Sequence, residues 1–210
     1  IAVQKVYDFI WDEFCDWYVE MAKFRIYHKE EAPEAANCAL WVLKTVLAQG
    51  LKLLHPFMPF ITEEIFTHLQ SDEETIMLSA WPEFKAEWNF DENEKEIDLI
   101  TEAVRAIRNI RAEMNVVPSK KATVFVVTQD SVIADMFDRS CVFFKTLAYA
   151  SELIIQSDKT GISSDAVSAV IPGATLYMPF AELVDISKEI ERLTKERDKM
   201  VKEVERVEKK

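Results

Sequence analysis

The side chains that most often carry catalysis are few and scattered in this 210-residue sequence. None of the three histidines, His28, His55 and His68, has the i,i+4 partner expected of a helical metal site. The three cysteines stand far apart, without C-x-x-C spacing, which is typical of buried, reduced thiols. The adjacent Glu63 and Glu64 fit the positive end of a helix dipole better than an acid/base pair. We therefore expect no catalytic or metal site.

Basic side chains gather in one stretch of an otherwise acidic chain. The formal net charge of −12 opposes the binding of a polyanion such as RNA. Residues 63–102, with 13 acids and two bases, account for most of this charge. Residues 103–125 instead hold five bases and one acid. Since a local field can attract a ligand that the total charge repels, RNA binding stays possible.

Aromatic residues crowd the first predicted helix and permit two interpretations. The set consists of Phe9, Trp11, Phe14, Trp17 and Tyr18. Its helical spacing is typical of a stripe that faces a core. Two cations, Lys23 and Arg25, follow, and exposed rings beside cations are also what unstacked RNA bases bind. Periodicity does not show which rings face solvent, so both interpretations stay open.

Hydrophobic periodicity predicts a mainly helical first half. Apolar residues recur at three- and four-residue steps over residues 3–25, 33–54 and 94–114, and a short helix is expected over 62–70. The two prolines of residues 55–60 forbid one continuous helix there, so the chain must turn and can insert Phe57 and Phe60 into the core.

After Pro118 the pattern changes to short strands alternating with a helix. β-branched and apolar residues predict strands over 122–128 and 153–156, with a helix over 132–150. The pair Pro172-Gly173 predicts the turn of a hairpin. These elements form a small α/β module.

The tail has the alternating three- and four-residue spacing of a coiled coil. Its seam comprises Leu183, Ile186, Ile190, Leu193, Arg197, Met200, Val204 and Val207. One helix cannot bury such a seam alone. It therefore pairs with a second copy, packs back on the chain, or has lost an antiparallel mate.

Several motifs resemble the helical anticodon-binding domain of class I aminoacyl-tRNA synthetases for Val, Ile, Leu and Met. The most specific is HPFMPFITEEI, residues 55–65, because its prolines, phenylalanines and acids rarely coincide. The other matching segments, in the expected order, are EFCDWY (13–18), SAWP (79–82) and IRNIRAE (107–113). The ending is most similar to the valyl-tRNA synthetase family, through PGATLYMP (172–179) and DISKEIERL (185–193).

This resemblance implies that the chain is part of a longer enzyme in which different domains bind the tRNA and activate the amino acid. The helical bundle receives the anticodon loop of valine tRNA, and a coiled-coil arm leans on the outer corner of the tRNA. Valine activation with ATP and Mg²⁺ belongs to an upstream domain, whose HIGH-type and KMSKS-type motifs do not occur here. We expect a cytoplasmic fragment without a cofactor of its own, inactive alone, and without the run of about 20 apolar residues that spans a membrane.

Basic side chains are the predicted contacts with tRNA. Phosphate and loop contacts are expected from Lys23, Arg25, Arg105, Arg108, Arg111, Lys120 and Lys121. One of the early aromatic rings is expected to stack on a base. Contacts with the corner of the tRNA are expected from Arg192, Lys195, Lys199 and Lys202.

The predicted fold is mainly α, in three parts. A helical anticodon-binding domain occupies residues 1–116, a small α/β connector 117–181 and a truncated coiled-coil helix 182–210. Weak self-association through the seam is also expected. The alternatives are a coiled-coil protein–protein adaptor that binds no RNA, or the same region of an isoleucyl or leucyl enzyme.

Overall fold

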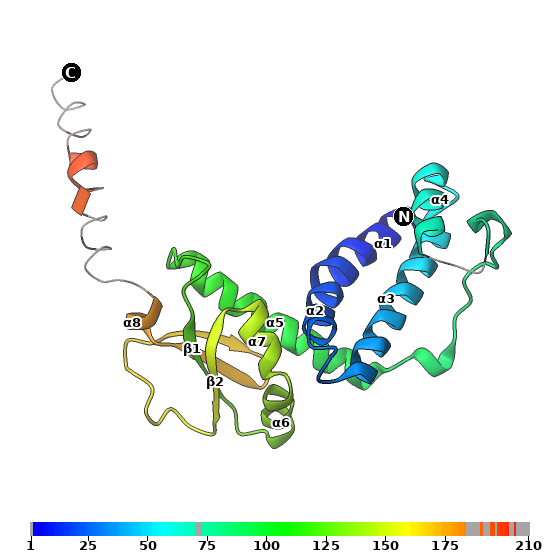
Figure 1. The fold of residues 1–210 in the computed structure, drawn as a ribbon. Helices are drawn as coiled ribbons and strands as arrows, with labels where there is room; N and C mark the ends of the chain where they lie inside the picture. The colour runs from blue at the N-terminus through cyan, green and yellow to red at the C-terminus, as the bar shows by residue number, and fades with distance from the viewer. Residues whose placement is uncertain are drawn as a thin grey trace. The chain divides into compact units, whose positions relative to one another are not determined.

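The computed structural model describes residues 2–69 and 73–183, together with residues 190, 194–195, 197–201 and 204. It contains two compact units, which are treated separately below (Figure 1). Unit 1 is Ile1–Phe90 and unit 2 is Asp91–Lys210.

Unit 1 is built on an antiparallel pair of helical rods (Figure 1). The first rod consists of α1 (Ala2–Asp8), the π-helical η1 (Phe9–Val19) and α2 (Glu20–Tyr27). The second is α3 (Pro33–Leu54), which begins at a proline because the first helical turn needs no proline N–H. The helices predicted over 3–25 and 33–54 are confirmed, although the middle of the first is π-helical.

Small residues allow the two rods to approach closely. Ala22, Ala36 and Ala39 are at most 3% exposed. A Cβ atom added to Gly50 would lie 3.2 Å from Cδ1 of Ile10, so these two residues face each other. This contact sets the antiparallel register of the rods.

The remaining elements of unit 1 pack along α3, from its C-terminal end back to Trp41, against which Trp88 packs edge-on. They are α4 (Pro59–His68), η2 (Ile76–Leu78) and η3 (Ala86–Trp88). Leu51, Phe66 and Ile76 form a small buried cluster. Helix α4 begins three residues before the predicted Thr62, because Pro59 occupies its first turn. Thr62 is buried inside the helix, where its hydroxyl donates to the Met58 carbonyl at 2.8 Å.

Unit 2 combines a long helix with a four-stranded sheet (Figure 1). Its helices are α5 (Asp91–Glu113), α6 (Ser131–Arg139), α7 (Cys141–Leu147) and α8 (Phe180–Leu183). Its strands are β1 (Ala122–Val127), β2 (Ala150–Gln156), β3 (Val167–Ile171) and β4 (Ala174–Met178), in the order β2-β1-β4-β3. β1 and β2 are parallel, and the other two pairs are antiparallel.

The predicted α/β pattern of this unit is confirmed with one difference. The helix expected over 132–150 is two helices that meet at Ser140, and Ala150 already belongs to β2. A parallel partner for β1 requires a crossover, which α6 and α7 supply. The predicted hairpin is present as β3 and β4, with Gly173 in its turn at φ +75°.

The core of unit 2 is completely enclosed. Val124, Val126, Phe137, Phe144 and Leu176 have no exposed surface. The rings of Phe137 and Phe144 lie 5.4 Å apart between their centroids. One face of β1 is buried at every second residue, as expected of a strand covered by helices on one side.

The division between the units falls before α5, which packs on β3 in unit 2. The sequence-based boundary at residue 116 places that helix with the first domain.

Within the predicted seam, Leu183 is 2% exposed, while Ile190, Met200 and Val204 are exposed. Ile186, Leu193 and Val207 lie outside the described residues, so the coiled coil stays a prediction. No helix in the described part of the chain is long and apolar enough to cross a bilayer.

Candidate nucleic-acid interface

The last turns of α2 present cations and an aromatic ring to solvent. Lys23 and Arg25 are exposed, and the ring of Tyr27 is 76% exposed. We call these three residues the α2 cluster. Lys23 Nζ donates to Glu20 Oε1 at 2.5 Å, and this hydrogen bond raises the pKa of Lys23. Lys23 therefore stays fully charged at neutral pH.

Some of the early aromatic residues face the core, as one interpretation of the sequence predicts, and others are exposed, as the RNA-binding interpretation requires. Phe14 and Trp17 are 7% and 6% exposed and belong to the core. Phe9 and Trp11 are 45% and 56% exposed, so their rings are accessible. Tyr18 is half-buried, and this burial raises its pKa while the nearby Arg25 lowers it. The aromatic set is therefore partly core and partly surface.

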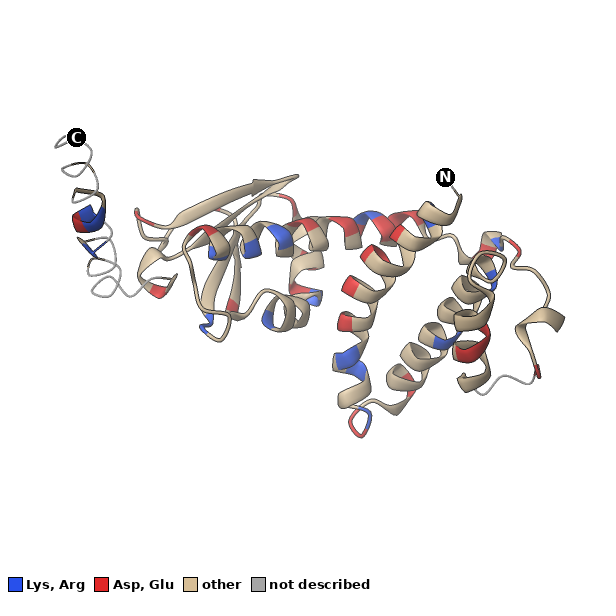
Figure 2. Ribbon diagram, turned by 90° about the horizontal axis from the view of Figure 1, so that it is seen from above, with Lys and Arg blue, Asp and Glu red and all other residues tan. Residues whose placement is uncertain are grey.

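Acidic residues predominate at the start of α5 and arginines in its second half (Figure 2). Asp91, Glu92 and Glu94 lie in its first turn, and the arginines lie toward its C-terminal end. Both placements suit the helix dipole. Arg105 and Arg108 are exposed, and Arg108 Nε donates to the Leu147 carbonyl at 2.9 Å. Part of the guanidinium of Arg108 is therefore committed to the fold.

Arg111 differs from the other two arginines, because it is only 5% exposed. Its Nη2 donates to the carbonyls of Val117, Pro118 and Lys120, at 3.2, 3.4 and 2.6 Å. Burial lowers its pKa, against a smaller opposing effect of Tyr149, whose ring centroid lies 5.5 Å from the guanidinium carbon. The expectation that Arg111 contacts RNA directly is corrected: it holds the turn after α5 and is enclosed there.

The turn held by Arg111 carries two more of the predicted residues. Lys120 is half-buried and Lys121 is exposed. In the tail, Lys195 and Lys199 are exposed. Arg192 and Lys202 lie outside the described residues. Of the predicted cations that the structure describes, two lie in unit 1 and the others in unit 2.

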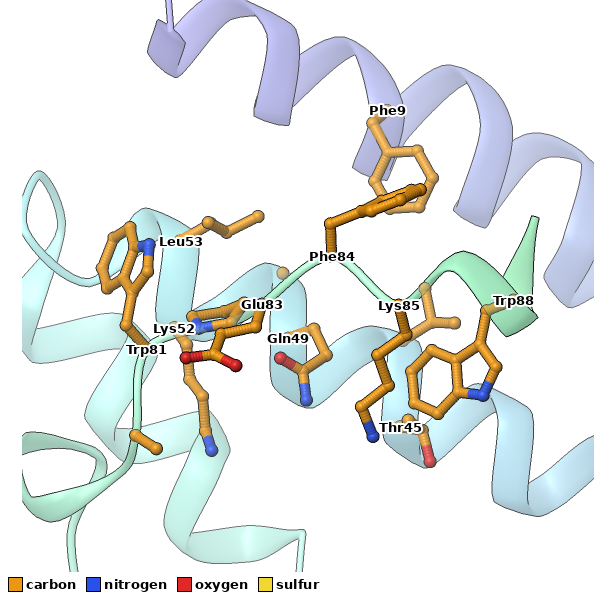
Figure 3. Close-up of a pocket in the computed structure, with 14 residues that line it drawn as sticks. Phe9, Thr45, Gln49, Lys52, Leu53, Trp81, Glu83, Phe84, Lys85 and Trp88 are labelled. Atoms are coloured by element: carbon orange, nitrogen blue, oxygen red, sulfur yellow. The ribbon is translucent and has the colours of Figure 1, made fainter.

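A pocket of about 580 Å³ in unit 1 was not predicted from the sequence (Figure 3). It lies between Phe9, the C-terminal half of α3 and residues 80–88. The ring of Phe84 points toward Phe9, whereas the polar ends of Gln49, Lys52 and Lys85 point the opposite way (Figure 3).

Cations and rings meet closely at this pocket. Lys85 Nζ lies 4.3 Å from the centroid of the Trp88 ring, which packs edge-on against Trp41. Lys52 Nζ lies 3.4 Å from Glu73 Oε2. Aromatic walls beside ammonium groups suit a planar ligand that carries negative charge. Trp81 and Trp88 were the only residues in the sequence that could have indicated this pocket, because the stretch around them otherwise resembles an acidic loop.

Comparison with known proteins defines the class of the chain. Residues 1–126 match the family model of the anticodon-binding domain of tRNA ligase, and the chain belongs to this family. The match includes both the helical hairpin of unit 1 and the arginine-bearing helix α5.

Similar full-length proteins include valine–tRNA ligases. The chain is 50% identical over 189 residues to the valine–tRNA ligase of Clostridium tetani, covering 90% of the chain and 21% of that protein. It is 48% identical over 210 residues to the enzyme of Clostridium acetobutylicum, covering 100% and 24%. For Carboxydothermus hydrogenoformans the identity is 41% over 209 residues, covering 100% and 23%. The predicted resemblance to the valyl-tRNA synthetase family is confirmed, and the chain spans about a quarter of the length of these relatives.

Proposed function

We propose that this chain binds tRNA as the anticodon-binding region of a valine–tRNA ligase. The match of residues 1–126 to the anticodon-binding domain family carries the proposal, and the similarity to valine–tRNA ligases supports valine as the amino acid. The adaptor without RNA binding is not favoured, because it leaves the family match unexplained. In the whole protein, ATP and Mg²⁺ serve an upstream catalytic domain in the cytoplasm. The chain itself supplies binding and orientation.

The α2 cluster is the proposed centre of the contact in unit 1. Lys23 and Arg25 supply charge for phosphates, and each neutralised phosphate releases counterions, which makes binding sensitive to salt. The exposed ring of Tyr27 offers a stacking surface for an unpaired base, a contact worth about 1–3 kcal/mol. Trp11 is a second exposed ring on the same rod.

The basic residues of unit 2 extend this proposal. Arg105, Arg108 and Lys121 are exposed, and Lys120 is half-buried, so all four can reach a polyanion. Lys195 and Lys199, with Arg192 and Lys202, are proposed to approach the corner of the tRNA through a coiled-coil arm. Weak self-association through the seam of that arm belongs to the same proposal.

Binding of valine tRNA and of an anticodon-swapped version, at two salt concentrations, tests the proposal. We expect weak binding whose affinity falls steeply as the salt concentration rises. Valine tRNA should bind more tightly than the version with the swapped anticodon. Equal binding of both tRNAs would contradict anticodon recognition. Absence of binding at low salt, together with a mass that rises with concentration, would support the adaptor instead.

A matched pair of variants locates the contact. Lys23→Ala with Arg25→Ala should weaken binding and reduce the salt slope by about 1 for each lost phosphate contact. Lys5→Ala is the control, because Lys5 is exposed on the same rod. It stands roughly 25 Å from Lys23 along the helix axis. Because the double change removes two charges and Lys5→Ala removes one, an effect of Lys5→Ala half as large as that of the double change would show that only the total charge matters.

A further inference from the structure

The turn between α3 and α4 carries a concentrated apolar surface. Phe60 is 90% exposed, Phe57 55%, Ile61 50% and Met58 49%. Ile65, one turn further along α4, is 37% exposed. We call these five residues the α4 apolar face. A helix at a finished surface normally turns polar residues outward, so a contiguous apolar face of this kind marks an interaction site.

The chemistry of this face disfavours a nucleic-acid ligand. The sequence contains no Lys or Arg between Lys52 and Lys85, so the face has no cation of its own to meet a phosphate. The opposite side of α4 is already used, because Thr62 and Phe66 are 1% exposed. A partner for the outer side must therefore be apolar protein.

The register of the two rods shows which polypeptide emerges beside this face. Ile10 faces Gly50, and the rods run antiparallel. Eight residues back from Ile10 is Ala2, and eight residues on from Gly50 is Met58. At a rise of about 1.5 Å per residue, Ala2 lies roughly 12 Å from the Ile10–Gly50 contact, and Leu54, where α3 ends before Met58, lies roughly 6 Å from it in the same direction. The start of α1 and the α4 apolar face are therefore at the same end of the hairpin (Figure 1).

We propose that the α4 apolar face is the docking surface for the polypeptide that precedes residue 2 in a longer valine–tRNA ligase. This inference rests on the proposed function, which makes the chain part of such an enzyme. The relatives are about four times as long as the matched region, so they contain ample polypeptide to cover the face. Covalent connection at Ala2 holds that polypeptide close to the face at a high effective concentration.

Footprinting of the native side chains tests the proposal without any tRNA. The full-length partner is the Clostridium acetobutylicum valine–tRNA ligase with its matched region replaced by this chain, to which it is 48% identical over 210 residues. Hydroxyl-radical modification of Met58 and Phe60 should fall strongly in the full-length protein compared with the 210-residue chain. Tyr27, 76% exposed at the other end of the first rod, is the internal control and should react equally in both. Equal modification of Phe60 in both proteins would overturn the proposal.

A pair of charge substitutions gives a second, independent measurement. Phe60→Asp should lower the unfolding midpoint of the full-length protein by at least about 2 °C. It should leave the midpoint of the 210-residue chain unchanged, because Phe60 is 90% exposed there. Tyr27→Asp should change neither midpoint.

If the 210-residue chain sediments as a dimer that Phe60→Asp separates, a second copy occupies the face and the proposal is wrong. Equal binding of valine tRNA and the anticodon-swapped tRNA, with modification of Phe60 still reduced in the full-length protein, would instead refute the proposed function alone.

Discussion

The two units treat their aromatic side chains in opposite ways. In unit 2, Phe137 and Phe144 have no exposed surface, and Tyr149 is the only exposed aromatic residue among those that the structure describes in this unit. In unit 1, Phe60 and Phe84 are 90% and 85% exposed, and most other rings are also accessible. The difference follows from what each unit packs together.

A sheet covered by helices encloses large side chains, whereas a narrow helical hairpin does not. Unit 2 places its rings between α6, α7 and the sheet. The rods of unit 1 meet partly through small residues such as Ala36, Ala39 and Gly50, so a few rings are buried and most of the others stay accessible. Unit 2 therefore has a self-contained core, while unit 1 holds apolar surface for other molecules or other parts of a longer protein.

The largest expected effect is the loss of a ring from the core of unit 2. Phe144→Ala removes a side chain with no exposed surface and should lower the free energy of unfolding by about 3–5 kcal/mol. Phe60→Ala in unit 1 should change it by less than about 0.5 kcal/mol in the 210-residue chain. Urea unfolding measures both. Equal losses would show that the contrast between the units is wrong.

The next effect concerns the buried arginine. Arg111→Met keeps the aliphatic length but leaves three backbone carbonyls without their donor, which should cost about 1–3 kcal/mol of unfolding free energy. Arg105→Met is the control on the exposed side of the same helix, with an expected change within about 0.5 kcal/mol. A similar cost for both would contradict the structural role assigned to Arg111.

A glycine-to-alanine change in each unit gives a further comparison between them. Gly173 has φ +75°, and an added Cβ would overlap with Cδ1 of Ile133. Gly173→Ala should therefore destabilise the protein by about 1–2 kcal/mol through its backbone conformation alone. Gly50→Ala meets only the end of the Ile10 side chain, at 3.2 Å. Because alanine favours a helix by about 1 kcal/mol, the net change at Gly50 should be smaller. Thermal unfolding ranks the two variants, and a larger loss at Gly50 would contradict the contrast.

The smallest effect is electrostatic and lies on the surface of unit 1. The Ser79 hydroxyl holds the pKa of Glu73 below its ordinary value, and Lys52 acts in the same direction. Because the folded pKa lies below the unfolded one, the stabilisation is present above the ordinary pKa and is lost as pH falls through the folded value. Ser79→Ala should raise the pKa of Glu73 in an NMR titration. Thr67→Ala, whose hydroxyl bonds the Glu64 carbonyl, should leave that titration unchanged.

Periodicity predicts the helices of this chain well, but not their ends or their environment. The start of α4 at Pro59 and the break at Ser140 depend on local backbone geometry that apolar spacing does not encode. Three-residue steps turn by about 300° on a helix, so Arg105 and Arg111 point about 120° apart. That rotation brings Arg111 to the buried side near Ile107 and Ile110.

The pocket of unit 1 was beyond prediction for a different reason. It requires residues 80–88 to cross α3 and lie opposite Phe9, and such long-range placement leaves no periodic signal in the sequence. The motif HPFMPFITEEI at residues 55–65 shows the converse. Its residues identified the family directly, yet only the structure showed that Phe57 and Phe60 point outward rather than into the core.

The bonding of Arg111 has a consequence for any measurement made in salt. Its partners are uncharged carbonyls in a mostly buried position, and such bonds respond far less to dissolved ions than an exposed ion pair does. The loop bearing Lys120 and Lys121 should therefore keep its conformation at ionic strengths that dissociate a polyanion. A salt titration of this protein then reports on ion release from the ligand, uncoupled from any loosening of the scaffold.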